Sequence, residues 1–256
     1  MFKAIRITLL LLLLFFVAVS TWLTQSRSTD WNNSLWVKVY PINADGSDAS
    51  RRYIKSLDVD TFRSIETFIA REAEKHGVSI DRPVRLELGR EIGEQPPPLG
   101  NSPSTLDVML WSLQLRWWAG SVTDGQDDPP PDVRIFVRYH APLDRIMLEN
   151  SIGMQKGMVG IVNVYADRSY AGSNNVIIAH EFLHTLGATD KYEPLSGLPH
   201  YPDGYAEPDR RPRHPQRYAE IMGGRIPESR NTANIPSSLK YVTIGPLTAQ
   251  EIRLVD

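Results

Sequence analysis

Short stretches of alternating hydrophobic and polar residues run along the chain, and this period of two predicts β-strands. The first of them contains Trp36, Val37, Val39 and Tyr40, which favour strands. Strands are predicted at residues 35–42, 84–88, 133–139 and 160–165, and a short strand-like run covers 241–244. Residues 43–50, with the pair Asp45-Gly46, are rich in turn formers and are predicted to be a loop.

A period near 3.6 marks the first predicted helix, residues 60–77. Asp60 is a suitable N-cap, and Gly77 is a suitable stop. Its buried face is predicted to consist of Phe62, Ile65, Phe68, Ile69 and Ala73.

A second helix is predicted at residues 106–118, after Ser104 or Thr105 as cap. Its predicted buried stripe consists of Leu106, Met109, Leu110, Leu113 and Trp117. The helix also carries Trp111 and Trp118, and we assign its tryptophans to the core because these side chains bury a large area. A surface for stacking substrate or resting on a membrane is the alternative.

A third helix is expected to start after Asn174 and Asn175, which are good N-cap residues, and to run to Gly187. A last helix is expected to begin at residues 248–251. Between them, residues 192–218 contain six prolines, a density that excludes a helix. Strands and helices in this order predict an α+β domain over residues 35–256, with a mixed twisted sheet and an irregular C-terminal subdomain.

The N-terminus has a different pattern, in which Lys3 and Arg6 precede an apolar run over residues 7–23. Seventeen residues are at the short limit for a membrane-spanning helix. We interpret residues 1–23 as an uncleaved signal anchor and residues 24–34 as a tether; a cleaved signal peptide, with Ala18-Val19-Ser20 as cleavage site, is the alternative. The anchor would leave the domain outside the cytoplasm, on the periplasmic or cell-surface side, and cleavage would secrete it.

The composition of the chain limits the kinds of partner and of catalytic or metal site that it can have. The 256 residues carry a formal net charge of −2, which gives no indication of a nucleic-acid partner. The chain has no cysteine, so disulfides, a thiol nucleophile and thiolate-bound zinc are excluded. Any metal site must therefore use histidine and carboxylate ligands.

Residues 180–190 supply such ligands in the pattern HExxHxxGxxD. His180 and His184 are one helical turn apart, so both imidazoles can reach one metal ion. Glu181 is placed to take a proton from a water on that metal. Gly187 permits a sharp turn that would return Asp190 as a third ligand, leaving one position open as in catalytic zinc sites.

This motif resembles that of the metzincin zinc metalloproteases, in the aspartate form found in snapalysin-type bacterial proteases. Metzincins also have a methionine-containing turn below the metal, and residues 218–224 resemble it, with Met222 as the methionine. The resemblance covers residues 174–224. It implies a metzincin-like fold, a Zn²⁺ cofactor bound by His180, His184 and Asp190, Glu181 as general base, and a protein or peptide substrate.

Several assignments stay open at this stage. His200, His214 and Glu207 are alternatives to Asp190 as third ligand, and Tyr192, Tyr201, Tyr205 or Tyr218 could stabilise the oxyanion. In metzincins an edge strand near the metal pairs with an extended substrate, and residues 150–165 are our candidate for it. The alternatives to an exported endopeptidase are a membrane-tethered binding or scaffold module with a relic zinc site, and a zinc amidase acting on cell-wall peptide. The oligomeric state is not predicted.

Overall fold

The computed structural model describes Arg6, Thr8 and residues 30–100, 104–123, 125, 129–142, 151–155 and 157–255. The predicted anchor, apart from Arg6 and Thr8, and the tether up to residue 29 lie outside these residues. In the part of the chain that is described, no helix is both long and apolar enough to span a bilayer.

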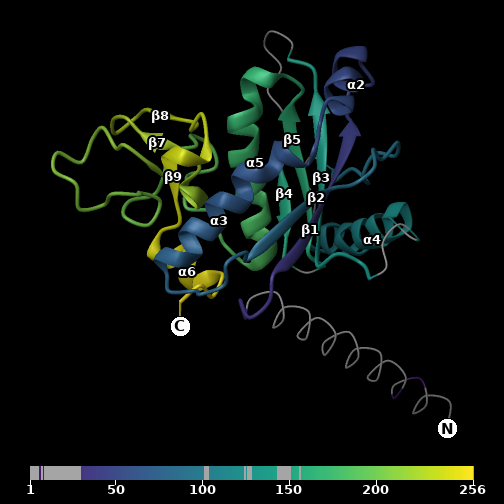
Figure 1. Ribbon diagram of the computed structural model, residues 1–256, viewed down its shortest axis with the longest axis horizontal. Coiled ribbons are helices and arrows are strands. Elements are labelled where there is room, and N and C mark those ends of the chain that lie inside the picture. Colours follow the sequence, from purple (N-terminus) through teal and green to yellow (C-terminus); the bar gives the residue numbers. More distant parts are fainter. Residues whose placement is uncertain are drawn as a thin grey trace.

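A five-stranded sheet forms the centre of the molecule, with the order β2-β1-β3-β5-β4 (Figure 1). Its strands are β1 (Leu35–Asn43), β2 (Val84–Leu88), β3 (Val133–His140), β4 (Ile152–Met154) and β5 (Val159–Tyr165). Neighbouring strands are parallel except at the β4 edge, where β4 runs antiparallel to β5. The predicted α+β class with a mixed sheet is confirmed.

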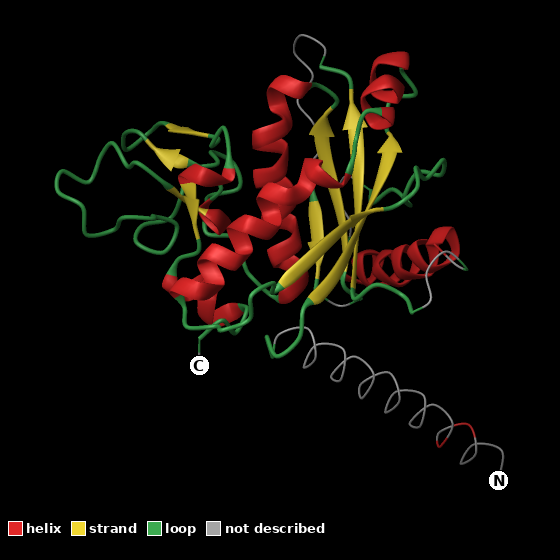
Figure 2. Cartoon of the chain, viewed as in Figure 1, coloured by secondary structure: helices red, strands yellow, loops and turns green. Residues whose placement is uncertain are grey.

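Helices cover both faces of this sheet (Figure 2). On one face, α3 (Arg63–Lys75) and α5 (Ala171–Leu186) enclose the larger hydrophobic core. On the other, α4 (Thr105–Thr123) packs through Trp111, Leu115 and Trp118 on Tyr40 and Phe136. This arrangement places α5 next to the β4 edge.

Short elements complete the fold. Two of them, η1 (Val59–Phe62) and η2 (Arg168–Tyr170), lead into α3 and α5. The C-terminal region contains β6 (Ala219–Glu220), η3 (Ile221–Gly223), β7 (Ile226–Pro227), β8 (Ala233–Asn234), η4 (Leu239–Tyr241), β9 (Val242–Thr243) and α6 (Pro246–Glu251). Residues 192–218 contain no helix, as their prolines predicted.

The predicted loop at residues 43–50 is wrong in its second half, because α2 (Asp48–Lys55) begins there. Ser47 caps this helix by accepting a hydrogen bond from the backbone N–H of Ser50. Turn formers and helix caps are the same residue types, so composition alone did not separate a loop from a capped helix start.

Two predicted N-caps are also wrong. Asp58, not Asp60, accepts from the backbone of Thr61 and starts the turn that leads into α3. Asn174 and Asn175 lie inside α5, where the first donates to the Tyr165 carbonyl and the second to the Thr61 carbonyl. These amides hold α5 to its neighbours.

The predicted buried stripe of α4 is on the solvent side. Leu106, Met109, Leu110, Leu113 and Trp117 are all exposed, and Trp117 is 75% exposed. The buried face consists of Trp111, Leu115, Trp118, Ala119 and Val122. Because α4 is apolar on both faces, periodicity did not determine which face meets the sheet, and the core assignment holds for Trp111 and Trp118 only.

Glu72 is fully buried on α3 and connects this helix to the C-terminal region. One oxygen accepts from Arg71 and Lys75, at 2.8 Å each, and the other accepts from the Thr243 hydroxyl and the Ile244 N–H, at 2.7 and 2.9 Å. Burial alone would raise the pKa of Glu72, but these hydrogen bonds outweigh it and hold the pKa below the ordinary value of 4.5.

We expect Glu72→Gln to lower the free energy of unfolding by about 1–3 kcal/mol, because the amide leaves buried donors poorly paired. With a lowered folded-state pKa, Glu72 contributes stability above pH 4.5, and this contribution is lost as the pH falls through the folded value. Urea titrations over this pH range measure it, and Glu74→Gln, on the exposed side of α3, is the control. Equal acid sensitivity of both variants and the parent would contradict the assignment.

Candidate metal centre

The end of α5 determines how the site is assembled. Gly187 has φ +111°, a left-handed conformation that glycine adopts without strain. Its N–H donates to the His184 carbonyl at 3.1 Å, and Ala188 donates to Leu183 at 3.1 Å, which ends the helix. The chain then reverses and returns Asp190 to the histidines.

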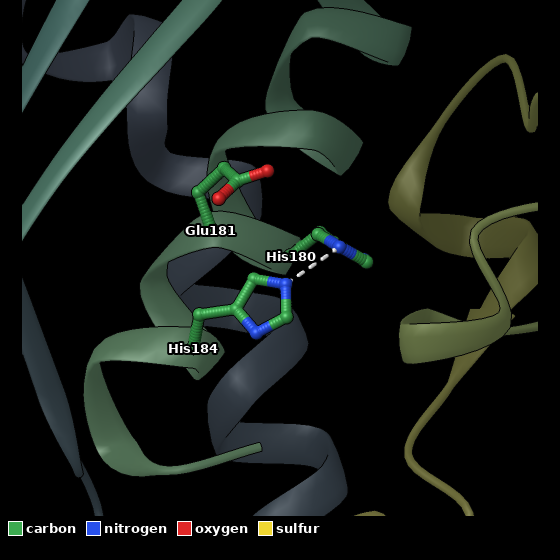
Figure 3. A group of neighbouring side chains, drawn as sticks. All are labelled: His180, Glu181 and His184. Atoms are coloured by element: carbon green, nitrogen blue, oxygen red, sulfur yellow. Dashed lines mark hydrogen bonds between the residues drawn. The ribbon is translucent and has the colours of Figure 1, made fainter. Parts of the chain in front are cut away.

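Three side-chain atoms meet at this point. Nε2 of His180 and Nε2 of His184 are 3.1 Å apart, and Oδ1 of Asp190 lies 3.1 Å from each of them. Figure 3 shows the two imidazoles turned toward one another on α5. Together with Glu181, the two histidines form a group whose possible ligand atoms all lie within 4.8 Å of one another.

The geometry and the donor set fit a zinc ion. Ligand atoms at the usual zinc distances, in a tetrahedral arrangement, are separated by about 3.3 Å, close to the spacing found here. Nδ1 of His180 donates to the Ile221 carbonyl at 2.9 Å, and Nδ1 of His184 donates to the Ala188 carbonyl at 2.8 Å. With the proton on Nδ1, each Nε2 presents its lone pair to a metal.

Burial and hydrogen bonding shift the pKa values of two candidate ligands, Asp190 and His180. Burial alone would raise the pKa of Asp190, but hydrogen bonds with His180 and His184 outweigh it and hold the pKa well below its usual range. Burial favours neutral His180, whereas the hydrogen bond with Asp190 favours the charged form and gives a raised pKa. The site therefore holds Asp190 as a carboxylate, the form that binds cations.

Glu181 is buried beside the histidines and differs from Asp190 in its hydrogen bonds. Its Oε2 has no hydrogen-bond partner within the described chain. Burial raises the pKa of Glu181, against the opposing effect of the nearby histidines. A buried, unpaired carboxyl oxygen next to candidate metal ligands is available to a water molecule or substrate.

The turn containing Met222 packs against α5. Met222 is fully buried in the larger core, and its carbonyl accepts from the Lys191 N–H at 2.9 Å, next to Asp190. The preceding residue, Ile221, supplies the carbonyl that orients His180. Glu220 holds the turn, since it accepts from the Gly223 N–H at 2.8 Å.

The three alternative third ligands are engaged elsewhere. His200 is 55% exposed and lies 3.9 Å from Glu193, and His214 pairs with the Tyr205 hydroxyl at 3.1 Å. Glu207 is paired with Arg217. Of the four candidates, only Asp190 has a side-chain atom in contact with the imidazoles of both His180 and His184.

Of the four candidate tyrosines, Tyr192 lies beside the ligand group, with its ring centre 6.2 Å from that of His180. Burial, together with the charges of Asp190 and Glu181, raises the pKa of Tyr192 to about 12. Its hydroxyl therefore stays protonated near neutral pH. Tyr201 and Tyr205 pack on each other, and Tyr218 lies beside Arg217.

β4 forms the sheet edge next to α5, inside the segment predicted to contain the substrate strand. A Cβ added at Gly153 would meet the His184 Cβ and would lie 2.5 Å from the Glu181 carbonyl. The strand can approach the helix this closely because residue 153 has no side chain. The sequence predicted a substrate strand within residues 150–165 but did not predict this close contact between Gly153 and α5.

We expect Gly153→Ala to push β4 away from α5 and to lower the free energy of unfolding by about 1–3 kcal/mol, the usual cost of overpacking. Thermal unfolding and zinc titration measure the effect. Gly93→Ala is the matched control, because a Cβ there has nothing within 4 Å. A Gly153→Ala protein as stable as this control would show that the contact is not tight.

Comparisons with known proteins do not assign a family. A scan against protein-family models finds no match, and no curated protein matches. Among solved structures, a chaperone–substrate complex is 16% identical, with a TM-score of 0.42, over 86% of this chain and 34% of that one. Inactive OgpA from Akkermansia muciniphila, solved with an O-glycopeptide substrate, is 11% identical, with a TM-score of 0.33, over 84% of this chain and 58% of that one. The chain thus spans about a third of the length of the first protein and less than three fifths of the length of the second.

Proposed function

We propose that this protein is an exported, zinc-dependent endopeptidase of the metzincin type. The observation that carries the proposal is the triangle of two imidazole nitrogens and one carboxylate oxygen, with the unpaired Oε2 of Glu181 beside it. Three protein ligands with a free position are typical of catalytic zinc sites, whereas structural sites use four.

His180, His184 and Asp190 would hold the ion. Bound zinc supplies a Lewis acid that polarises a carbonyl and makes water acidic enough to act as nucleophile near neutral pH. The carbonyls of Ile221 and Ala188 hold the imidazoles in the required orientation, and the turn containing Met222 supports them from below.

Glu181 and Tyr192 act on the substrate in this proposal. Glu181 takes a proton from the attacking water and returns it to the leaving amine, a transfer helped by the raised pKa of its carboxyl group. Tyr192 keeps its hydroxyl proton and donates a hydrogen bond to the oxyanion.

An extended peptide would bind along β4. This strand is the sheet edge beside α5, and only its β5 side is paired within the described sheet. Pairing through the backbone holds a substrate with little dependence on its sequence and presents one carbonyl to the site. The substrate we infer is therefore an unfolded or extended protein segment.

Metal removal tests the proposal. We expect a chelator to abolish cleavage of an unstructured protein or a peptide library, with a loss of about a thousandfold, and added Zn²⁺ to restore it. Cleavage that persists without metal would overturn the proposal. Zinc binding with no peptide cleavage would favour the scaffold alternative, and cleavage of cell-wall peptide alone would favour the amidase.

A further inference from the structure

We propose that the exposed side of α4 lies on a lipid bilayer and holds the domain against the membrane surface. This α4 outer face consists of Leu106, Met109, Leu110, Leu113 and Trp117, whose exposed fractions range from 56% to 75%. The proposal concerns a surface on the other side of the sheet from α5 and does not depend on peptidase activity.

The α4 outer face is one continuous helical surface. Its residues follow the spacing i, i+3, i+4, i+7, i+11, which places them in a single row about 16 Å long. The opposite side of α4 is already occupied, because Trp111, Leu115 and Trp118 pack against the sheet. The outer face is therefore additional apolar surface that the core does not use, which marks an interaction site.

The charge pattern favours lipid as the partner. The face itself is uncharged, and the charged residues of α4 are Asp107 and Arg116. Asp107 is held by Ser104 at the start of the helix, and Arg116 is half-buried with its Nε donating to the Ser112 carbonyl at 3.2 Å. A helix with leucines, a methionine and a tryptophan on one exposed side fits the boundary between lipid headgroups and acyl chains.

The face lies near the point where the chain enters the domain. Thr123, at the end of α4, accepts from Nε of Arg134 at the start of β3 at 3.1 Å. β1 begins beside the same end of β3, since Asp132 accepts from the Trp36 N–H at 2.8 Å. The start of β1 and the C-terminal end of α4 therefore share one end of the sheet.

The sequence before this point supplies a second apolar element. The apolar run ends at Leu23, and the described domain begins at Asp30. Seven residues, from 24 to 30, span at most about 24 Å when extended, so a run embedded in lipid would keep the domain close to the bilayer. Trp31 fixes the start of the domain, because its Nε1 donates to the Ile252 carbonyl at 2.8 Å. One bilayer could therefore take up both the apolar run of residues 7–23 and the α4 outer face, because the start of β1 and the end of α4 share one end of the sheet.

The absence of cysteine from the chain allows a direct test. The full chain is reconstituted in phosphatidylethanolamine–phosphatidylglycerol vesicles with a nitroxide on Leu113→Cys or, in a second variant, on Trp117→Cys. Leu195→Cys is the matched control, an exposed leucine in the C-terminal region. Collision rates with oxygen, which concentrates in lipid, and with a water-soluble nickel chelate then report the surroundings of each label.

We expect both α4 labels to collide more with oxygen than with the nickel chelate, and the Leu195→Cys label to show the reverse. An α4 label that meets the nickel chelate as freely as the control would overturn the proposal. Shielding from both reagents would also overturn it, because protein would then cover the face. Spin–spin broadening that disappears on dilution with unlabelled chain, while the shielding persists, would identify a second copy as the cover.

Discussion

Glu181→Gln is expected to reduce peptide cleavage by about 10²–10⁴-fold while zinc binding is retained. The amide has nearly the shape of the carboxyl group, but it cannot take a proton from water. His180, His184 and Asp190 are unchanged, so the metal should stay. Steady-state cleavage of a quenched fluorescent peptide and zinc content of the same preparation provide the two measurements.

The control for this variant is Glu193→Gln, which neutralises an exposed carboxylate on the loop just after Asp190. We expect it to cleave at the parent rate. Full activity in Glu181→Gln would show that another group is the general base. Loss of zinc from Glu181→Gln would instead place Glu181 among the ligands, a result that its membership in the His180–Glu181–His184 group makes worth measuring.

The sequence predicted the buried residues correctly where a helix has one polar face and one apolar face. α3 has one polar and one apolar face with a clear helical period, so its buried residues Ile65, Phe68 and Ile69 were predicted correctly. α4 is apolar on two opposite faces, and no period distinguishes a face that meets a sheet from one that meets another apolar environment. The error at α4 therefore has a physical cause, and the same cause motivates the membrane proposal.

The candidate metal centre also has one part that the sequence predicted and one part that it did not. The histidine spacing and the glycine turn are local, so the meeting of His180, His184 and Asp190 could be expected from eleven residues of sequence. The groups that support them come from distant segments. Ile221 and Gly153 lie far from α5 in the chain, and only the packing of η3 and β4 on this helix brings them to the site.

Removing the Asp190 carboxylate should have the largest effect on metal binding. We expect Asp190→Ala to weaken zinc affinity by more than about a hundredfold, because loss of an outer-shell partner alone costs about 10–100-fold. Competition with a chromophoric chelator measures the affinity, and thermal unfolding without metal checks that the fold is intact. Cleavage should fall with zinc occupancy and recover in part at high zinc concentration.

Asp203→Ala is the matched control, since it removes an exposed carboxylate from the same C-terminal region. If Asp190→Ala binds zinc as tightly as this control, the third ligand is another residue, and His200→Ala and His214→Ala become the variants to compare. A weaker affinity in Asp190→Ala alone would separate a true ligand from a carboxylate that merely pairs with two imidazoles. That distinction matters because a hydrogen-bonded triad and a metal site share the same three atoms, and only the response to zinc distinguishes them.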